Sequence, residues 1–305
     1  DLNVKKGDKL FALGEYYDAA NQYKLAYTRT PIKERTLRGK QALKMAECYR
    51  KINYTQRAIS AYLNAIRYKQ TDSLTYINLG MQYLKDGNYK EAEKVFSEIL
   101  GYNQNNNLAK EGLESAREAP IKKKEASSYI IKYADAINSR RTDYSPMLYG
   151  DEYNQLYFTS TRNQSQGKEL SGITGTKNGD IFYCQKDDKG NWGKVQAIES
   201  GLNSSQDEGA CSFTPDGHTM YLTKCDNDPQ YPRYATICTS NRSDALWGKP
   251  TSLEITKDTL SSYAHPAVSP DGKWLYFTSD MPGGLGGLDI WRVRITTHGL
   301  GGVEN

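Results

Sequence analysis

Residues 264–280 have the sequence AHPAVSPDGKWLYFTSD, and this stretch decides the fold of the second half of the chain. Two alternating apolar segments flank Asp271-Gly272, a dipeptide that favours a tight β-hairpin. The phrase returns as GACSFTPDGHTMYLT at 209–223, again around an Asp-Gly pair. A looser copy combines YSPML at 144–148 with LYFTS at 156–160. Repetition on this scale predicts an architecture built by stacking one structural unit.

Each copy belongs to a longer unit that is predicted to hold four short strands. The lead-in Ile137-Asn138-Ser139 recurs as Leu202-Asn203-Ser204. Trp192 and Trp247 occupy the same place in successive units, and we expect them to pack between sheets, with stacking on a ligand as the alternative. Four strands in a repeat of this length are typical of a β-propeller blade. About three blades are predicted, and residues 299–305 are expected to begin a fourth.

The first half of the chain shows helical spacing of its apolar residues, and small and aromatic residues recur in it at longer intervals. From Ala19 to Ala58 the interval is 39 residues, and from Ala58 to Ala92 it is 34. An interval of 34 residues is typical of tetratricopeptide repeats, which this region resembles. Gly and Ala are expected to let paired helices approach closely while aromatics fill the gaps. The recurring residues are Gly7, Ala19 and Tyr23, then Ala46, Ala58 and Tyr62, then Gly80, Ala92 and Phe96.

The resemblance predicts three helix pairs and a solvating helix at about 108–117. The five extra residues between the first two repeats, near 31–38, should lengthen a loop or a helix. Stacked pairs of this type curve and leave a concave groove, lined by the first helix of each pair. We interpret the groove as a basic binding site for a partner protein or peptide; a solvated face of a spacer is the alternative. The residues predicted to face it are Lys5, Asp8, Lys40, Glu47, Arg50, Lys51, Met81 and Lys85.

The charge is divided unevenly along the chain. Residues 1–142 carry 26 Lys and Arg against 16 Asp and Glu, a net charge of +10, whereas residues 143–305 carry 14 against 20, a net charge of −6. This division suggests two domains with different partners, although ordinary variation in surface charge would also produce it. No apolar run reaches the ~20 residues of a membrane-spanning helix.

The segment 119–126, APIKKKEA, is predicted to be a linker. Pro120 is expected to stop the preceding helix, and the lysine run is expected to be solvated. It lacks interleaved aromatic residues, so no nucleic-acid partner is predicted. The chain does not begin with Met, and a propeller needs at least four blades to close, so we expect it to be a piece of a longer protein.

Catalytic motifs are missing from this sequence. It contains no nucleophile elbow of the form G-x-S-x-G, and residues 283–287, GGLGG, join predicted strands rather than open a helix. Of three histidines, only His265 falls in a predicted inner strand, where it is a candidate for lining the propeller channel. We therefore predict a protein that is not an enzyme and holds no cofactor.

Metal and disulfide chemistry receive little support. Asp226 and Asp228 could suggest calcium, but they lack the spacing of a calcium loop, and no metal is predicted. The Asp residues before Ile181 and Ile290 are expected to bind blade turns instead. The five cysteines form no C-x-x-C pair; one disulfide within residues 211–238 remains open, but buried thiols are favoured.

The phrase Pro-Asp-Gly-Lys-x-Leu-Tyr-Phe-Thr-Ser resembles the WD40-like PD40 blades of TolB-type periplasmic propellers, over about residues 127–298. Tetratricopeptide repeats followed directly by such blades are similar to a family of Bacteroidetes envelope proteins that continue into an OmpA-like peptidoglycan-binding domain. The resemblance implies a scaffold of the type IX secretion system in the periplasm, associated with the outer membrane, whose partners are other envelope and secretion-complex proteins. It implies contact with peptidoglycan only through the OmpA-like domain, which this sequence does not contain.

The sequence thus predicts a multidomain α + β protein: a tetratricopeptide α-solenoid at 1–118, the linker at 119–126, and an incomplete β-propeller at 127–305. The predicted function is that of a non-catalytic, protein-binding scaffold. Two alternatives stay open: a propeller module that binds a ligand or a peptidoglycan fragment, and the regulatory part of a longer enzyme.

Overall fold

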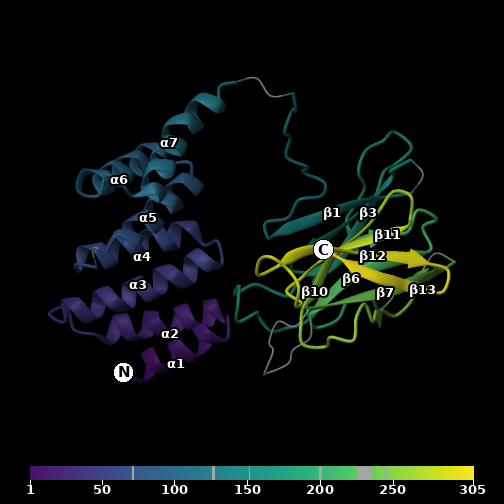
Figure 1. Ribbon diagram of the computed structural model, residues 1–305, viewed down its shortest axis with the longest axis horizontal. Coiled ribbons are helices and arrows are strands. Elements are labelled where there is room, and N and C mark those ends of the chain that lie inside the picture. The colour runs from purple at the N-terminus through teal and green to yellow at the C-terminus, as the bar shows by residue number, and fades with distance from the viewer. Residues whose placement is uncertain (71, 126–127, 151, 199–200, 226–234, 245) are drawn as a thin grey trace. The chain divides into compact units, whose positions relative to one another are not determined.

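The computed structural model contains two compact units, a helical unit and a β unit (Figure 1). The helical unit comprises residues 1–131 with 171–175, and the β unit comprises residues 132–170 with 176–305. Among the described residues, no helix has the length and hydropathy needed to cross a membrane. The structure describes residues 1–70, 72–125, 128–150, 152–198, 201–225, 235–244 and 246–305.

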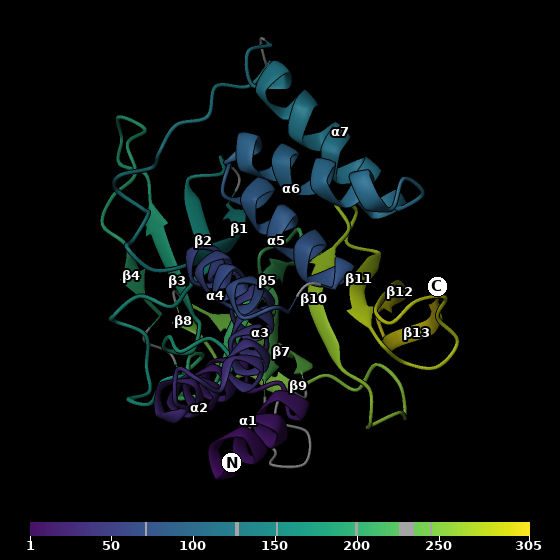
Figure 2. The same cartoon turned by 90° about the vertical axis from the view of Figure 1, so that its left-hand side faces the viewer.

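Seven helices stack in chain order in the described part of the helical unit (Figure 2). Side-chain oxygens of Asp72, Asn88 and Asn106 accept backbone N–H bonds at the starts of the fifth, sixth and seventh helices, which fixes where each begins. Three helix pairs and a final helix form the predicted tetratricopeptide-type arrangement. The helices are α1 (Leu2–Ala12), α2 (Tyr16–Arg29), α3 (Arg35–Lys51), α4 (Thr55–Arg67), α5 (Ser73–Lys85), α6 (Tyr89–Tyr102) and α7 (Asn107–Lys122).

Small residues face aromatic rings between these helices, as the repeat pattern predicts. A Cβ atom added to Gly7 would lie 2.6 Å from the Tyr23 ring, and one added to Gly80 would lie 2.6 Å from the Phe96 ring. Tyr62 fills the corresponding place in the second pair and is fully buried. The helices can therefore approach only because these positions carry no larger side chain. The extra residues between the first two repeats lengthen α3, which has 17 residues against 13 in α5.

The seventh helix corrects the prediction that Pro120 ends it. Pro120 lies inside α7, and the helix continues to Lys122. A proline lacks the backbone N–H that would bond to the carbonyl four residues earlier, here that of Ala116, so it weakens a helix most when further turns follow. Because Pro120 stands in the last turn, only a few backbone bonds follow it, and the last of them runs from the Lys123 N–H to the Ala119 carbonyl at 3.0 Å. The first part of the predicted linker is therefore helical.

Three antiparallel sheets make up the described part of the β unit. The first contains β1 (Asp143–Tyr149), β2 (Gln155–Ser160), β3 (Asp180–Gln185) and β4 (Gln196–Ala197) in that order. The second contains β5 (Glu208–Phe213), β6 (Thr219–Cys225), β7 (Ala235–Ser243) and β8 (Leu246–Trp247), with β9 (Thr251–Ser252) also paired to β7. The third contains β10 (Tyr263–Val268), β11 (Trp274–Ser279), β12 (Asp289–Thr296) and β13 (Gly299–Glu304).

The Asp-Gly hairpins form as predicted. Asp216-Gly217 joins β5 to β6, and Asp271-Gly272 joins β10 to β11, with both glycines at a φ of 70°. That left-handed conformation is one that glycine adopts without strain. The last segment differs from expectation, because β13 pairs with β12 and is the fourth strand of the third sheet. It therefore does not begin a fourth unit.

Apolar clusters lie between neighbouring sheets. Tyr157 of the first sheet packs in one cluster with Phe213 and Trp247 of the second, which confirms that Trp247 packs between sheets. Tyr221 of the second sheet packs in another with Phe277 of the third. Each sheet is thus buried against the next one along the chain, as expected for stacked repeats.

Candidate functional site

Two chains of hydrogen bonds link α1, α3 and α5, the first helices of the three pairs. In the first, the Asp8 carboxylate accepts bonds from the Tyr23 hydroxyl, at 2.7 Å, and from the Lys44 ammonium. In the second, the Glu47 carboxylate accepts bonds from the Tyr62 hydroxyl and, at 3.0 Å, from the Asn78 amide. The polar sides of the three helices therefore form one continuous surface, which we call the groove face.

The electrostatics of the groove face follow from these bonds. The Lys44 ammonium holds the pKa of the Asp8 carboxyl below its usual value. Burial, followed by the bond to Glu47, raises the pKa of the Tyr62 hydroxyl, so this group keeps its proton at every physiological pH and donates a hydrogen bond to the carboxylate. Glu47 also forms an ion pair with Arg50 at 2.7 Å. Both carboxylates are therefore occupied by partners within the helical unit.

The predicted groove residues fall on the helical turns that these bonds connect. Lys40 and Lys51 lie seven positions before and four after Glu47 on α3, and Met81 and Lys85 lie three and seven positions after Asn78 on α5. Residues at such spacings share one side of a helix. Lys5 likewise lies three positions before Asp8 on α1.

The cations of the groove face differ in what they contact. Lys51 lies 5.9 Å from the centre of the Tyr16 ring, and Lys85, 34 positions later, donates a hydrogen bond to the Asn53 side chain. Each therefore reaches back to the turn of the preceding helix pair. Lys5 and Lys40 are exposed and form no ion pair or hydrogen bond with the residues that the structure describes. These two cations are the ones available to a partner.

Sequence reasoning missed Lys44 and Asn78 on this face. Lys44 lies four positions after Lys40, and Asn78 lies three positions before Met81, so helical spacing from the predicted residues would have found both. Whether the predicted residues bind a partner stays a prediction.

Removing the Tyr62 hydroxyl tests how far these bonds hold the groove face together. We expect Tyr62→Phe to lower the free energy of unfolding of the helical unit by about 1.5–3 kcal/mol, because a buried bond to a charged acceptor is lost. Urea unfolding followed by far-ultraviolet circular dichroism measures the change. Tyr102→Phe is the matched control, since the Tyr102 side chain is 58 % exposed. Equal effects of the two substitutions would contradict the assignment.

His265 lies in a β-bulge of β10, with a left-handed φ of 55° and an exposed side chain. Ser145 and Ala210 occupy the same bulge in the first and second sheets, at φ values of 51° and 46°. The backbone N–H of His265 donates to Thr223 at 2.9 Å, and that of Ala210 donates to Thr159 at 3.1 Å. The bulge thus links the second sheet to the first and the third sheet to the second, while a channel-lining role of the His265 side chain stays a prediction.

The Asp residues before Ile181 and Ile290 bind turns, which confirms the prediction for them. The Asp180 carboxylate accepts the backbone N–H of Gln166 at 2.7 Å, and the Asp289 carboxylate accepts that of Gly286 at 2.9 Å. Within the described residues, no cluster of three His, Cys, Asp or Glu side chains could hold a metal ion. Asp226 and Asp228 lie outside the described residues.

Three cysteines are buried thiols. Cys48, Cys184 and Cys211 are buried and form no disulfide. Burial raises the pKa of Cys48 to about 12 and that of Cys211 to about 12. These two thiols therefore stay protonated near neutral pH, which disfavours a role as nucleophile or metal ligand.

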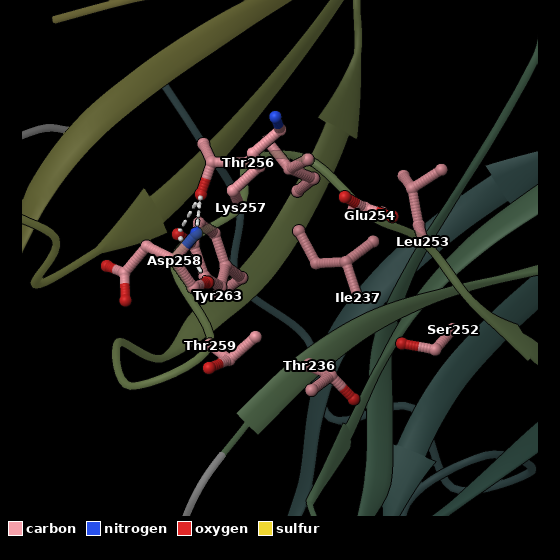
Figure 3. Close-up of a pocket in the computed structure, with 11 residues that line it drawn as sticks. Thr236, Ile237, Ser252, Leu253, Glu254, Thr256, Lys257, Asp258, Thr259 and Tyr263 are labelled. Carbon is pink, nitrogen blue, oxygen red and sulfur yellow. Dashed lines mark hydrogen bonds between the residues drawn. The ribbon is translucent and has the colours of Figure 1, made fainter.

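A pocket of ≈ 440 Å³ lies beside β7, β9 and the residues that lead to β10. Figure 3 shows Thr256, Asp258 and Tyr263 gathered together and bonded to one another. The hydroxyls of Thr256 and Tyr263 lie 2.6 Å apart, and the Asp258 N–H donates to Thr256 at 3.1 Å. These three polar groups therefore have partners within the pocket wall.

Comparisons with known proteins give only distant likenesses. No protein-family model matches the chain, and no curated protein matches it in sequence. The chain is similar to the first TPR of Spaghetti (RPAP3) bound to an HSP90 peptide, with 21 % identity, a TM-score of 0.35, and coverage of 39 % of this chain and 91 % of that one. It is similar to the Sgt2 TPR domain from Aspergillus fumigatus, with 20 % identity, a TM-score of 0.34, and coverage of 45 % and 91 %.

A third likeness is to a puromycin-hydrolysing peptidase of Mycobacterium tuberculosis, with 16 % identity and a TM-score of 0.34. It covers 54 % of this chain but only 22 % of the peptidase. At these scores the likenesses add nothing to the geometry described above.

Proposed function

We propose that the chain is a non-catalytic scaffold that binds an acidic segment of a partner protein on its groove face. The observation that carries the proposal is the pair Lys5 and Lys40, exposed on this face and without a described partner. Exposed cations on a surface shared by three helices attract an acidic chain, speed its association and fix its register. Met81, 48 % exposed on the same face, offers an apolar contact beside them.

The β unit, in this proposal, forms consecutive blades of a WD40-like propeller. Its three described sheets support this, because each begins with a bulged strand and its first four strands lie side by side in the order of the chain. A propeller offers further protein-binding surface and needs no catalytic group to do so. The scaffold therefore has two binding units in one chain.

We further propose that this scaffold acts in the periplasm at the outer membrane, similar to PorE of the type IX secretion system. The order of tetratricopeptide repeats before PD40-like phrases supports this setting. Attachment to the cell wall would then come from a C-terminal OmpA-like domain outside this sequence, and the partners would be envelope and secretion-complex proteins.

Reversing the two unpartnered charges tests the groove face. We expect Lys5→Glu with Lys40→Glu to weaken binding of an acidic peptide of alternating Glu and Leu by roughly tenfold, since each exposed charge pair contributes only ~0.2–1 kcal/mol and two are inverted. Fluorescence anisotropy of the labelled peptide, at low salt, measures the affinity.

The control carries the same change of charge elsewhere on the helical unit. Lys90→Glu with Lys94→Glu places it on α6, where both lysines are exposed. We expect the control to keep most of the affinity, and we expect an envelope protein that co-purifies with the native chain to be lost only from the groove variant. Equal losses, or none in either variant, would overturn the proposal.

A further inference from the structure

A second pocket, of ≈ 320 Å³, lies between the first and second sheets of the β unit. Its walls come from β2, β3 and β4 on one side and from β7 and β8 on the other. Tyr157 and Tyr183 line it with stacked rings 5.7 Å apart, and the Trp247 indole N–H donates to the Tyr157 hydroxyl at 3.3 Å. These contacts fix an aromatic wall against which a ligand can be held.

Arg242 gives this pocket its charge. Its Nη1 donates to the Tyr149 hydroxyl at 2.6 Å, and its guanidinium lies 5.8 Å from the centre of the Trp247 ring. Its Nε is buried without a hydrogen-bond partner, and no carboxylate among the described residues forms an ion pair with it. A buried, unpaired N–H of a cation costs free energy. The Nη2 group also has no partner among the described residues, and a guanidinium N–H donates a strong, charge-assisted hydrogen bond to a carboxylate.

Two glutamines add further hydrogen-bond donors to the pocket. The Tyr157 hydroxyl donates to the Gln155 side-chain oxygen at 3.4 Å, and the Tyr183 hydroxyl donates to that of Gln196 at 3.2 Å. These bonds occupy the amide oxygens and leave the amide nitrogens as donors. Together with Arg242 they make a pocket that mostly donates hydrogen bonds, which suits a ligand that mostly accepts them.

We propose that this pocket binds the free C-terminal carboxylate of a peptide. A peptide end presents a carboxylate to Arg242 and carbonyl oxygens to the glutamine amides, so every donor gains an acceptor. Saccharide hydroxyls donate as well as accept and match this set less closely. The volume lies at the lower end of the range for small-ligand sites, so the pocket takes the end of a chain rather than a long segment.

Isothermal titration calorimetry on the whole chain tests the proposal with two probes, N-acetyl-alanyl-alanine and its C-terminal amide. We expect the free acid to bind at least tenfold more tightly than the amide, because only the acid carries the negative charge that pairs with Arg242. Sodium acetate and glucuronate complete the series and are expected to bind more weakly than the peptide acid.

Variants connect this preference to the pocket. Arg242→Gln is expected to remove the preference for the acid, whereas Arg294→Gln should leave it unchanged. Arg294 is the matched control, since it is exposed on β12 and lies 5.9 Å from the centre of the Trp274 ring, away from the pocket. Gln196→Ala removes one of the two glutamine amide donors, and its side chain is exposed, so it keeps the test open if Arg242→Gln fails to fold. We expect it to weaken the acid about threefold.

Three results would overturn the proposal outright: equal affinities for acid and amide, equal effects of the two arginine variants, or no effect of Gln196→Ala in a folded chain. Acetate binding as tightly as the peptide acid would also overturn it and would indicate an adventitious anion only. Tighter binding of glucuronate would overturn it by assigning the pocket to a sugar acid. None of these results bears on the groove face, because the peptides and variants concern the β unit alone.

Discussion

Replacing Gly112 by alanine is expected to lower the free energy of unfolding of the helical unit by about 1–3 kcal/mol, the usual cost of overpacking a filled core. A Cβ atom at Gly112 would lie 2.4 Å from Cζ of Phe96, which real side chains do not tolerate. Phe96 cannot retreat, because Gly80 of α5 packs against the same ring so closely that a Cβ atom added there would also lie 2.6 Å from it. The ring is fully buried, so either α7 or α5 must move.

Gly101→Ala is the matched control for this prediction. Gly101 lies in α6, and a Cβ atom added there would meet nothing within 4 Å. Alanine is favoured over glycine in a helix by roughly 0.5–1 kcal/mol, so we expect this variant to be more stable than the native chain. Urea unfolding followed by far-ultraviolet circular dichroism reports on the helices. If both substitutions stabilise the unit, the close approach of α5, α6 and α7 is wrong.

The packing of the helical unit follows from its sequence because each contact repeats at a fixed interval. Gly80 and Phe96 belong to the predicted set of small and aromatic residues, and the structure brings them together. Gly112 does not belong to it, because α7 is a single helix without a partner to complete a repeat. The contacts of Lys51 and Lys85 also escaped prediction, since each depends on the turn of the preceding pair rather than on its own helix.

The β unit shows the same division between local and distant contacts. The Asp-Gly hairpins are local, so the sequence is sufficient to predict them. The backbone N–H groups of the bulges in the second and third sheets donate to Thr159 and Thr223, which lie more than 40 positions earlier in the chain. The spacing of residues within one strand cannot predict such contacts. The pocket around Arg242 combines side chains of two sheets in the same way, and its chemistry appears only when Tyr149 and Trp247 are seen beside it.

We expect the ionisation of the buried Asp180 carboxyl to have the largest effect on how the free energy of unfolding of the β unit depends on pH. It is fully buried, one of its oxygens has no hydrogen-bond partner, and the other accepts only the Gln166 N–H. Burial raises the pKa of Asp180 from 3.8 to about 7, and the nearby carboxyl of Glu208 adds to the rise while Lys177 opposes it. Burial also raises the pKa of Glu208.

The sign of the pH dependence follows from that raised pKa. Below pH 3.8 Asp180 is protonated in the folded and the unfolded chain, so it adds no slope. Between pH 3.8 and about 7 the unfolded chain releases the proton and the folded chain keeps it, so stability falls as the pH rises. The slope approaches 1.4 kcal/mol per pH unit, and the total loss above pH 7 is roughly 4 kcal/mol.

Asp180→Asn should abolish this loss. We expect the variant to gain roughly 4 kcal/mol over the native chain at about pH 8 relative to about pH 4, because the amide keeps an acceptor for the Gln166 N–H and never ionises. All four tryptophans, at 192, 247, 274 and 291, lie in the β unit, so their fluorescence in urea follows this unit alone. Taking the difference between the two chains removes the part of the Glu208 contribution that does not depend on Asp180.

Asp289→Asn separates burial from the loss of a turn contact. Asp289 accepts the Gly286 N–H at the same strand position in the third sheet, but its side chain is only half-buried. If burial is the cause, the difference between variant and native chain should grow with pH at Asp180 and stay constant at Asp289. If the stability difference grows equally with pH at both positions, the effect comes from the turn contact. If the stability difference at Asp180 does not change with pH, the Asp180 carboxyl is in contact with water or another partner in the folded chain.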